Sequence, residues 1–314
     1  MPVEIKFILF QLVIIIPFIL GSFLKRQFRN PSGVAQKIVR ANLIFVEPFV
    51  VIWSIWGLAL TPELLLLPLA GLILVLGGFM LGYATVAFTR LKEKSRATYL
   101  ISSSLANHGF TMGGFLCYIF GGFNGLGMSS IFLVYFMPYI FAVIFPFAGF
   151  ASRKEGFSLD MLKKLFINRQ NMPLYATGLA LTLHLFHIPR PAFAFPMDMI
   201  LMVSISMYYI TLGLNFTFSD IKALRPEHLF LALGKFIALP ALTWGALRFI
   251  ELDRDIESVI MLQSFMPAAI YSVLSSILYD LDMRLASGLF VVNTVIFLVV
   301  VLPVLFLLNG VLFF

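Results

Sequence analysis

Ten long apolar stretches, separated by short polar segments, constrain this chain more than any other feature of its sequence. A helix rises about 1.5 Å per residue, so roughly 20 apolar residues cross the ~30 Å hydrocarbon core of a bilayer. With 61% hydrophobic and 12% charged residues, the chain has too few polar side chains to coat a water-soluble globule. The sequence therefore predicts an all-α polytopic membrane protein with ten transmembrane helices. The stretches lie near residues 5–24, 41–60, 64–89, 97–120, 126–150, 172–188, 197–217, 229–249, 258–279 and 285–308.

Basic residues predict how the helices are oriented. Most Lys and Arg residues lie in loops that follow odd-numbered spans, from Lys25 after the first span to Arg284 after the ninth. Short basic loops stay in the cytoplasm, so both termini are expected on the extracytoplasmic side of a bacterial inner membrane or plasma membrane. The net charge of +7 is then a topology signal. Because these cations are spread over separate short loops, the sequence predicts no nucleic-acid partner.

The longest loop divides the chain into two halves. Residues 1–150 are expected to form a first repeat of five helices, residues 151–171 a cytoplasmic linker, and residues 172–314 a second repeat. Since five is odd, the two halves must be inverted relative to each other. The linker has apolar residues at near-helical spacing beside Lys163 and Lys164, which predicts a short amphipathic helix on the lipid surface. These apolar residues are Phe157, Leu159, Met161, Leu162, Leu165 and Phe166.

Polar interruptions occur at matching places in the two halves. Residues 102–109 (Ser-Ser-Ser-Leu-Ala-Asn-His-Gly) lie midway through the fourth span, and residues 263–267 (Gln-Ser-Phe-Met-Pro) lie midway through the ninth. Pro267 has no N–H, so the carbonyl of Gln263 loses its helical partner. A carbonyl without a partner is costly in hydrocarbon. Paired interruptions at this depth are typical of secondary transporters.

Crossing of the two broken helices would direct the positive ends of half-helices toward the membrane centre. Such an arrangement suits a carboxylate ligand. The alternative is a proline kink packed by a neighbouring helix, with the serines bonded to their own backbone. The candidate substrate-binding residues are Asn107, Pro267, Ser103, Ser104, Gln263, Ser264 and His108.

Two ionisable residues lie inside apolar spans. Glu47 in the second span and Lys235 in the eighth are candidates for coupling or gating, since ionisable residues are rare at this depth. Glu47 could instead face a cytoplasmic vestibule or pair with a neighbour, and Lys235 could be that neighbour. Lys235 could also extend its ammonium group to the cytoplasmic surface.

Several short motifs resemble the auxin efflux carrier family of the bile-acid/sodium-symporter-like fold. They are Leu-Ala-Asn-His-Gly-Phe at 105–110, Asn-Arg-Gln-Asn-Met-Pro-Leu at 168–174 and Ile-Thr-Leu-Gly at 210–213. The longest runs from Met-Pro-Ala-Ala at 266–269 through Tyr279-Asp280 and Asn293-Thr294 to Leu302-Pro303.

The resemblance implies inverted five-helix repeats in which spans four and nine cross as broken helices near the substrate. It further implies a scaffold of spans 1, 2, 6 and 7, an interleaved transport domain of spans 3–5 and 8–10, elevator-type movement and a homodimer formed through the scaffold. Asn107 and Pro267 are the site residues that match best.

The function expected from these features is secondary active or facilitated transport of a small organic anion, auxin-like or malonate-like by resemblance. The sequence predicts no enzyme, no bound metal and no cofactor, and it leaves proton or sodium coupling open. Oxygens of Ser104, Asn107, Gln263 and Ser264 could bind sodium, but no acidic residue accompanies them in span nine. A sodium-coupled bile-acid-type symporter is one alternative. The other is an intramembrane enzyme that acts on a lipid-linked substrate with His108 as its base.

Overall fold

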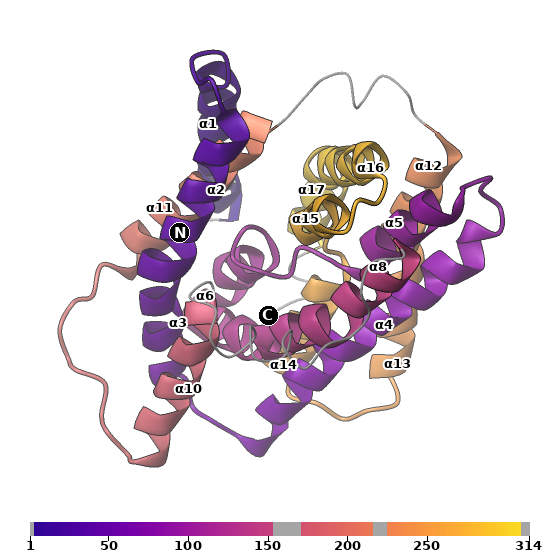
Figure 1. The fold of residues 1–314 in the computed structure, drawn as a ribbon. Coiled ribbons are helices and arrows are strands. Elements are labelled where there is room, and N and C mark those ends of the chain that lie inside the picture. Colours follow the sequence, from indigo (N-terminus) through magenta and orange to yellow (C-terminus); the bar gives the residue numbers. More distant parts are fainter. Residues whose placement is uncertain (1–2, 153–170, 216–224, 309–314) are drawn as a thin grey trace. The chain divides into compact units, whose positions relative to one another are not determined.

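The computed structural model describes residues 3–152, 171–215 and 225–308, and most of this part of the chain is helical (Figure 1). Within these ranges no strand occurs, and the one β-type contact is an antiparallel bridge between Ala106 and Ala268. The predicted all-α class is confirmed. The predicted amphipathic helix of the linker falls on residues 153–170, outside the described residues.

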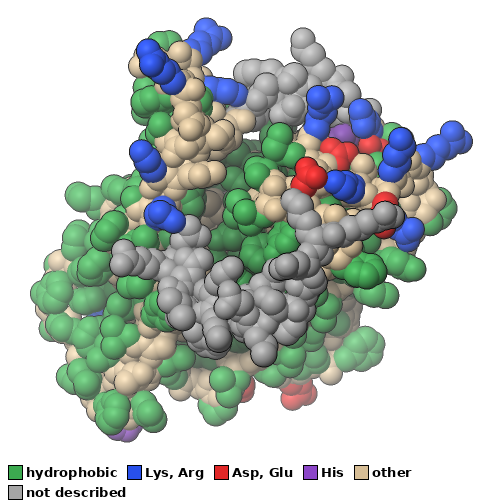
Figure 2. All heavy atoms as spheres, viewed as in Figure 1, with side chains coloured by type: hydrophobic (Ala, Val, Ile, Leu, Met, Phe, Trp, Pro, Cys, Tyr) green, Lys and Arg blue, Asp and Glu red, His purple; other side chains and the backbone are tan. Residues whose placement is uncertain are grey.

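Long apolar helices dominate the structure. Phe249 is 91% exposed and Leu307 is 84% exposed, and Figure 2 shows hydrophobic side chains over much of the face in view. Apolar surface of this extent is stabilised by lipid rather than by water, so the helices are typical of an integral membrane protein. In the described ranges six helices are long and apolar enough to cross a membrane: Pro31–Trp56, Pro62–Val86, Gly113–Ala151, Met197–Asn215, Pro226–Leu247 and Met283–Leu307.

Of the other expected spans, the first is helix α1 (Val3–Leu24), and the fourth, sixth and ninth contain shorter or interrupted helices. Helices α5 (Glu93–Ser104), α14 (Arg254–Ser264) and α15 (Ile270–Leu278) cover parts of the expected fourth and ninth spans, and each alone is too short to cross the bilayer. Within α6 (Gly113–Phe132), Gly122 leaves the helical conformation with a φ of 61°. The arrangement of ten spans in two inverted repeats therefore stays a prediction.

The helices group into two compact units. Unit 1 comprises Met1–Leu60, Gly109–Ile131 and Ile167–Thr217, and unit 2 comprises Thr61–His108, Phe132–Phe166 and Phe218–Phe314. Besides most of α6, unit 1 contains α1 (Val3–Leu24), α2 (Pro31–Ala41), η1 (Asn42–Val46), α3 (Glu47–Trp56), α10 (Met172–Leu185) and α11 (Met197–Asn215). Besides α5, α14 and α15, unit 2 contains η2 (Pro62–Leu65), α4 (Leu66–Val86), η3 (Leu133–Tyr135), α7 (Phe136–Tyr139), η4 (Ile140–Ile144), α8 (Phe145–Ala151), α12 (Pro226–Leu233), η7 (Gly234–Ala238), α13 (Leu239–Leu247), α16 (Met283–Ile296), η8 (Phe297–Val301) and α17 (Leu302–Leu307).

Glycines allow α1 to pack closely against α11 in unit 1. A Cβ atom on Gly21 would lie 2.2 Å from the carbonyl oxygen of Ile210, and one on Gly213 would lie 2.2 Å from that of Phe18. The two helices therefore touch backbone to backbone, an approach that small residues allow between membrane helices.

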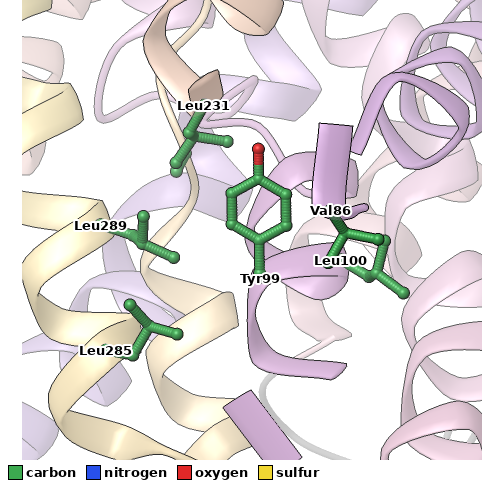
Figure 3. Close-up of a cluster of buried hydrophobic side chains, with 7 residues drawn as sticks. Val86, Tyr99, Leu100, Leu231, Leu285 and Leu289 are labelled. Atoms are coloured by element: carbon green, nitrogen blue, oxygen red, sulfur yellow. The ribbon is translucent and has the colours of Figure 1, made fainter. Parts of the chain in front are cut away.

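A buried apolar cluster joins α4, α5, α12 and α16 in unit 2 (Figure 3). The aromatic ring of Tyr99 lies among aliphatic side chains (Figure 3). The hydroxyl of Tyr99 is 2.8 Å from the hydroxyl of Thr85. This contact gives the buried phenol a polar partner. The cluster consists of Val86, Tyr99, Leu100, Leu231, Ala268, Leu285 and Leu289.

Four π-helical turns share one sequence position relative to proline. The turns η1, η4, η7 and η8 each end two residues before a proline, namely Pro48, Pro146, Pro240 and Pro303. In each case the residue directly before the proline donates its N–H to the carbonyl five residues earlier. A proline ring clashes with the carbonyl four residues before it, so the wider turn relieves that clash without ending the helix. Glu47 directly follows one of these turns, and Lys235 lies inside another.

Candidate functional site

Helices α5 and α14 of unit 2 both end inside expected membrane spans. α5 ends at Ser104 and α14 ends at Ser264, so each helix continues slightly into the polar stretch that was expected to interrupt it. The chain is not helical over residues 105–108 and 265–269. We call these two segments the crossover.

The two segments of the crossover pair through their backbones. The N–H of Asn107 donates to the carbonyl of Pro267 over 2.7 Å, and the N–H of Ala269 donates to the carbonyl of Leu105 over 3.2 Å. These bonds flank the antiparallel bridge and satisfy polar groups that the broken helices would otherwise leave without partners. Asn107 and Pro267, the two residues that the sequence analysis placed first among the site candidates, therefore lie side by side.

Two amide side chains hold the crossover in place. Asn293 of α16 accepts a hydrogen bond from the N–H of Ala268 over 2.8 Å, and Nε2 of Gln263 donates to the carbonyl of His108 over 3.2 Å. The carbonyl of Gln263, which the proline deprives of its helical partner, accepts instead from the N–H of Met266 over 3.3 Å. Both segments are thus fixed by neighbouring polar groups.

Lys235 reaches the crossover from the eighth expected span. Its side chain is 2% exposed, and Nζ donates to the carbonyls of Ser104 and Leu105 over 3.3 and 3.2 Å. The alternative that Lys235 extends to the cytoplasmic surface is therefore wrong. The carbonyl of Leu105 accepts from both Lys235 and Ala269, so the ammonium is bonded directly to a group that pairs the two segments.

Two tyrosines that sequence reasoning missed complete the polar surroundings. Nδ1 of His108 lies 2.5 Å from the hydroxyl of Tyr135, and the hydroxyl of Ser104 lies 2.8 Å from that of Tyr139 and donates to the carbonyl of Val75 over 2.9 Å. A buried tyrosine hydroxyl needs a partner, and the spacing of four residues places both phenols on one helical face. This spacing of the two tyrosines is the feature of the sequence that could have identified them as neighbours of the site.

Two of the predicted site serines are bonded within their own helices. The hydroxyl of Ser103 donates to the carbonyl of Tyr99 over 2.9 Å, and that of Ser264 donates to the carbonyl of Met261 over 2.6 Å. For these hydroxyls the structure matches the alternative stated above, in which serines in membrane helices bond to their own backbone.

A small cavity of about the size of one water molecule adjoins Lys235 inside unit 2. Gly78 and Gly82 of α4 leave room for the cavity and for α5. A Cβ atom on Gly78 would lie 2.4 Å from the carbonyl oxygen of Ser103. The polar side chains that line the cavity are those of Lys235, Ser103, Tyr99 and Thr85.

Glu47 belongs to unit 1 and has a partner of its own. Its side chain is 5% exposed and accepts a hydrogen bond from the hydroxyl of Tyr208 over 2.5 Å. One turn earlier, Asn42 donates to the hydroxyl and the carbonyl of Ser204 over 2.9 and 3.2 Å. Of the alternatives stated for Glu47, pairing with a neighbour is therefore the one observed, through a bond between α3 and α11.

Charges of both signs meet at the crossover. The C-terminal ends of α5 and α14 bring partial negative charge to the crossover, and the Lys235 ammonium and the N-terminal end of α15 bring positive charge. In the described residues no group of three or more His, Cys, Asp or Glu side chains could hold a metal ion.

Comparison with known proteins brings no further assignment. No family model matches the chain, and no curated protein matches it.

Replacing Asn293 with leucine is expected to destabilise the crossover by about 1–3 kcal/mol, because the buried N–H of Ala268 loses its acceptor. Hydrogen exchange at Ala268 should become at least tenfold faster (~1.4 kcal/mol). The matched control is Asn215→Leu in α11, where the amide is exposed and bonds only locally, to Thr211. Unchanged exchange at Ala268 would contradict the role given to Asn293.

Proposed function

We propose that this protein is a membrane carrier for a small organic anion, which binds beside the crossover of unit 2. One observation carries the proposal: two helices of an apolar, all-helical chain stop inside expected membrane spans and pair through their backbones. Non-helical backbone at membrane depth is costly unless protein or a water-filled path surrounds it. Crossing broken helices are a recurring solution for binding a solute near the bilayer midplane.

The charges around the crossover favour a carboxylate as the solute. Lys235 is a buried cation, and in the described residues no acidic side chain forms an ion pair with it. The positive end of α15 adds a favourable partial charge. Asn107 is half-buried and lies within the crossover, where its backbone N–H bonds to Pro267, and its side-chain amide is our first candidate for contact with the anion.

Movement of the elevator type is part of the proposal, together with ten spans in two inverted repeats. The two compact units support it, because such a mechanism needs one body that carries the site and another that stays in place. Unit 2 contains both segments of the crossover and would carry the anion, and unit 1 would be the scaffold. Both termini would then be extracytoplasmic.

Sodium-coupled transport is less favoured by the same contacts. The Lys235 ammonium is already bonded to the carbonyls of Ser104 and Leu105 at the crossover and would repel a sodium ion bound beside it. An enzymatic role for His108 is also less favoured, since its imidazole is 1% exposed and is bonded to Tyr135. We therefore propose transport without a chemical step.

Small carboxylates are expected to raise the apparent unfolding temperature of the purified protein, because a ligand that binds only the native state stabilises it by mass action. At 100 times the dissociation constant the gain is about 2.7 kcal/mol. We would screen malonate, other dicarboxylates and aromatic monocarboxylates, each with sodium or choline as the cation, and follow a hit by uptake into proteoliposomes.

The variants Asn107→Ala and Pro267→Ala should lose this stabilisation, whereas Asn215→Ala, in α11 of unit 1, should keep it. If no carboxylate stabilises the wild type, or if Asn107→Ala responds as the wild type does, the anion site is not at the crossover. Stabilisation that requires sodium would favour the symporter.

A further inference from the structure

Lys235 contacts the crossover as a metal cation would. Its Nζ bonds to two successive backbone carbonyls, those of Ser104 and Leu105, at the point where α5 ends. Carbonyl oxygens at a helix end have no helical partner and carry the negative end of the helix dipole. Rings of such oxygens are what proteins use to hold monovalent metal ions.

The route of the side chain to these carbonyls is built into unit 2. Lys235 lies in the π turn η7, which the following Pro240 accounts for. Gly78 and Gly82 of α4 and Gly234 of the turn itself line the cavity beside it, so no side chain from those positions competes for the space. In the described residues Lys235 forms no ion pair, and its hydrogen bonds go to the two carbonyls.

We propose that the Lys235 ammonium is a built-in cation of the crossover, which occupies a monovalent-cation site formed by the carbonyl oxygens of Ser104 and Leu105. The site is complete in the native chain and takes no dissociable cation. Shortening the side chain opens it to small primary ammonium ions and to sodium. This inference concerns the backbone structure of the crossover and does not depend on which solute the protein carries.

Electrostatics explain why the native site excludes a second cation. Two unit charges about 4 Å apart at an effective dielectric constant of about 20 repel each other enough to lower affinity roughly a thousandfold. A sodium ion bound to the same carbonyls would lie at about this distance from the ammonium. The native protein is therefore expected to be indifferent to sodium at the crossover.

Chemical rescue tests the inference without any transported solute. The side chain that Lys235→Ala removes is equivalent to n-propylammonium, and 1-propanol has the same shape without the charge. We would measure the apparent unfolding temperature of the wild type, Lys235→Ala and Lys235→Met in n-propylammonium chloride, sodium chloride, 1-propanol and choline chloride. Hydrogen exchange at Asn107 and Ala269 reports on the crossover itself, since both N–H groups bond across it.

The inference predicts that n-propylammonium raises the unfolding temperature of Lys235→Ala saturably, by at least about 3 °C, and slows its exchange at Asn107 and Ala269. Sodium should act on this variant more weakly, and neither salt should act on the wild type beyond the choline control. Lys235→Met, which fills the space without charge, should exchange at least about tenfold faster than the wild type and should not be rescued.

Three results would overturn the inference. They are equal rescue by 1-propanol, wild-type exchange rates in Lys235→Met, and stabilisation of the wild type by sodium. If Lys235→Ala does not fold, exchange in Lys235→Met decides the matter. Because no carboxylate is present, failure here leaves the carrier proposal intact, and failure of the carboxylate screen leaves this inference intact.

Discussion

Replacing Gly213 with alanine is expected to destabilise unit 1 by about 3 kcal/mol, the upper end of the usual cost of overpacking. The new Cβ would lie 2.2 Å from the carbonyl oxygen of Phe18 and 2.7 Å from the backbone nitrogen of Ser22. Both are backbone atoms of α1, so no side-chain rotation can relieve the clash and the two helices must separate. The measurement is unfolding in a denaturing detergent, followed by circular dichroism.

The control for this prediction is Gly178→Ala in α10. A Cβ atom there would meet nothing within 4 Å, and alanine has the higher helix propensity, so this variant should be as stable as the wild type or slightly more stable. Equal stability of Gly213→Ala and Gly178→Ala would show that α1 and α11 do not touch as described.

Gly78→Ala is expected to have the second largest effect, this time on the crossover. Its Cβ would lie 2.4 Å from the carbonyl oxygen of Ser103, next to the carbonyls that Lys235 holds. Displacing the end of α5 should cost about 2 kcal/mol of stability and should weaken carboxylate binding at least tenfold. Both quantities follow from thermal unfolding with and without the carboxylate identified in the screen.

Gly245→Ala in α13 is the matched control, because a Cβ atom there meets nothing within 4 Å. It should bind the carboxylate as the wild type does. If Gly78→Ala also binds normally while its stability falls, the end of α5 does not shape the anion site.

The positions of the interruptions could be predicted because they depend on local chemistry. Pro267 cannot continue a helix, and serines, asparagine and glycine weaken one. Their partners could not be predicted in the same way. Which carbonyl receives the N–H of Asn107, and which side chain receives that of Ala268, depends on residues far away in sequence.

The direction of a long side chain was the other property that the sequence could not decide. Lys235 lies at a depth from which its ammonium could reach either the surface or the protein interior. The hydropathy of the sequence is the same for either direction of the side chain. The difference comes from Gly78 and Gly82, which leave space on the neighbouring helix α4. Likewise, a proline predicts a disturbed helix, but its relief by a π turn two residues earlier is visible only in the structure.

The pairing within the crossover also constrains the order in which this protein can mature. His108 and Gln263 are 155 residues apart and yet bonded to each other. At roughly 5–20 residues per second of synthesis, the first segment waits on the order of 10–30 s for its partner. During that time its backbone N–H and C=O groups have no native acceptor or donor from the second segment. The nascent first half is therefore expected to satisfy these backbone groups with other polar partners until the second half has emerged.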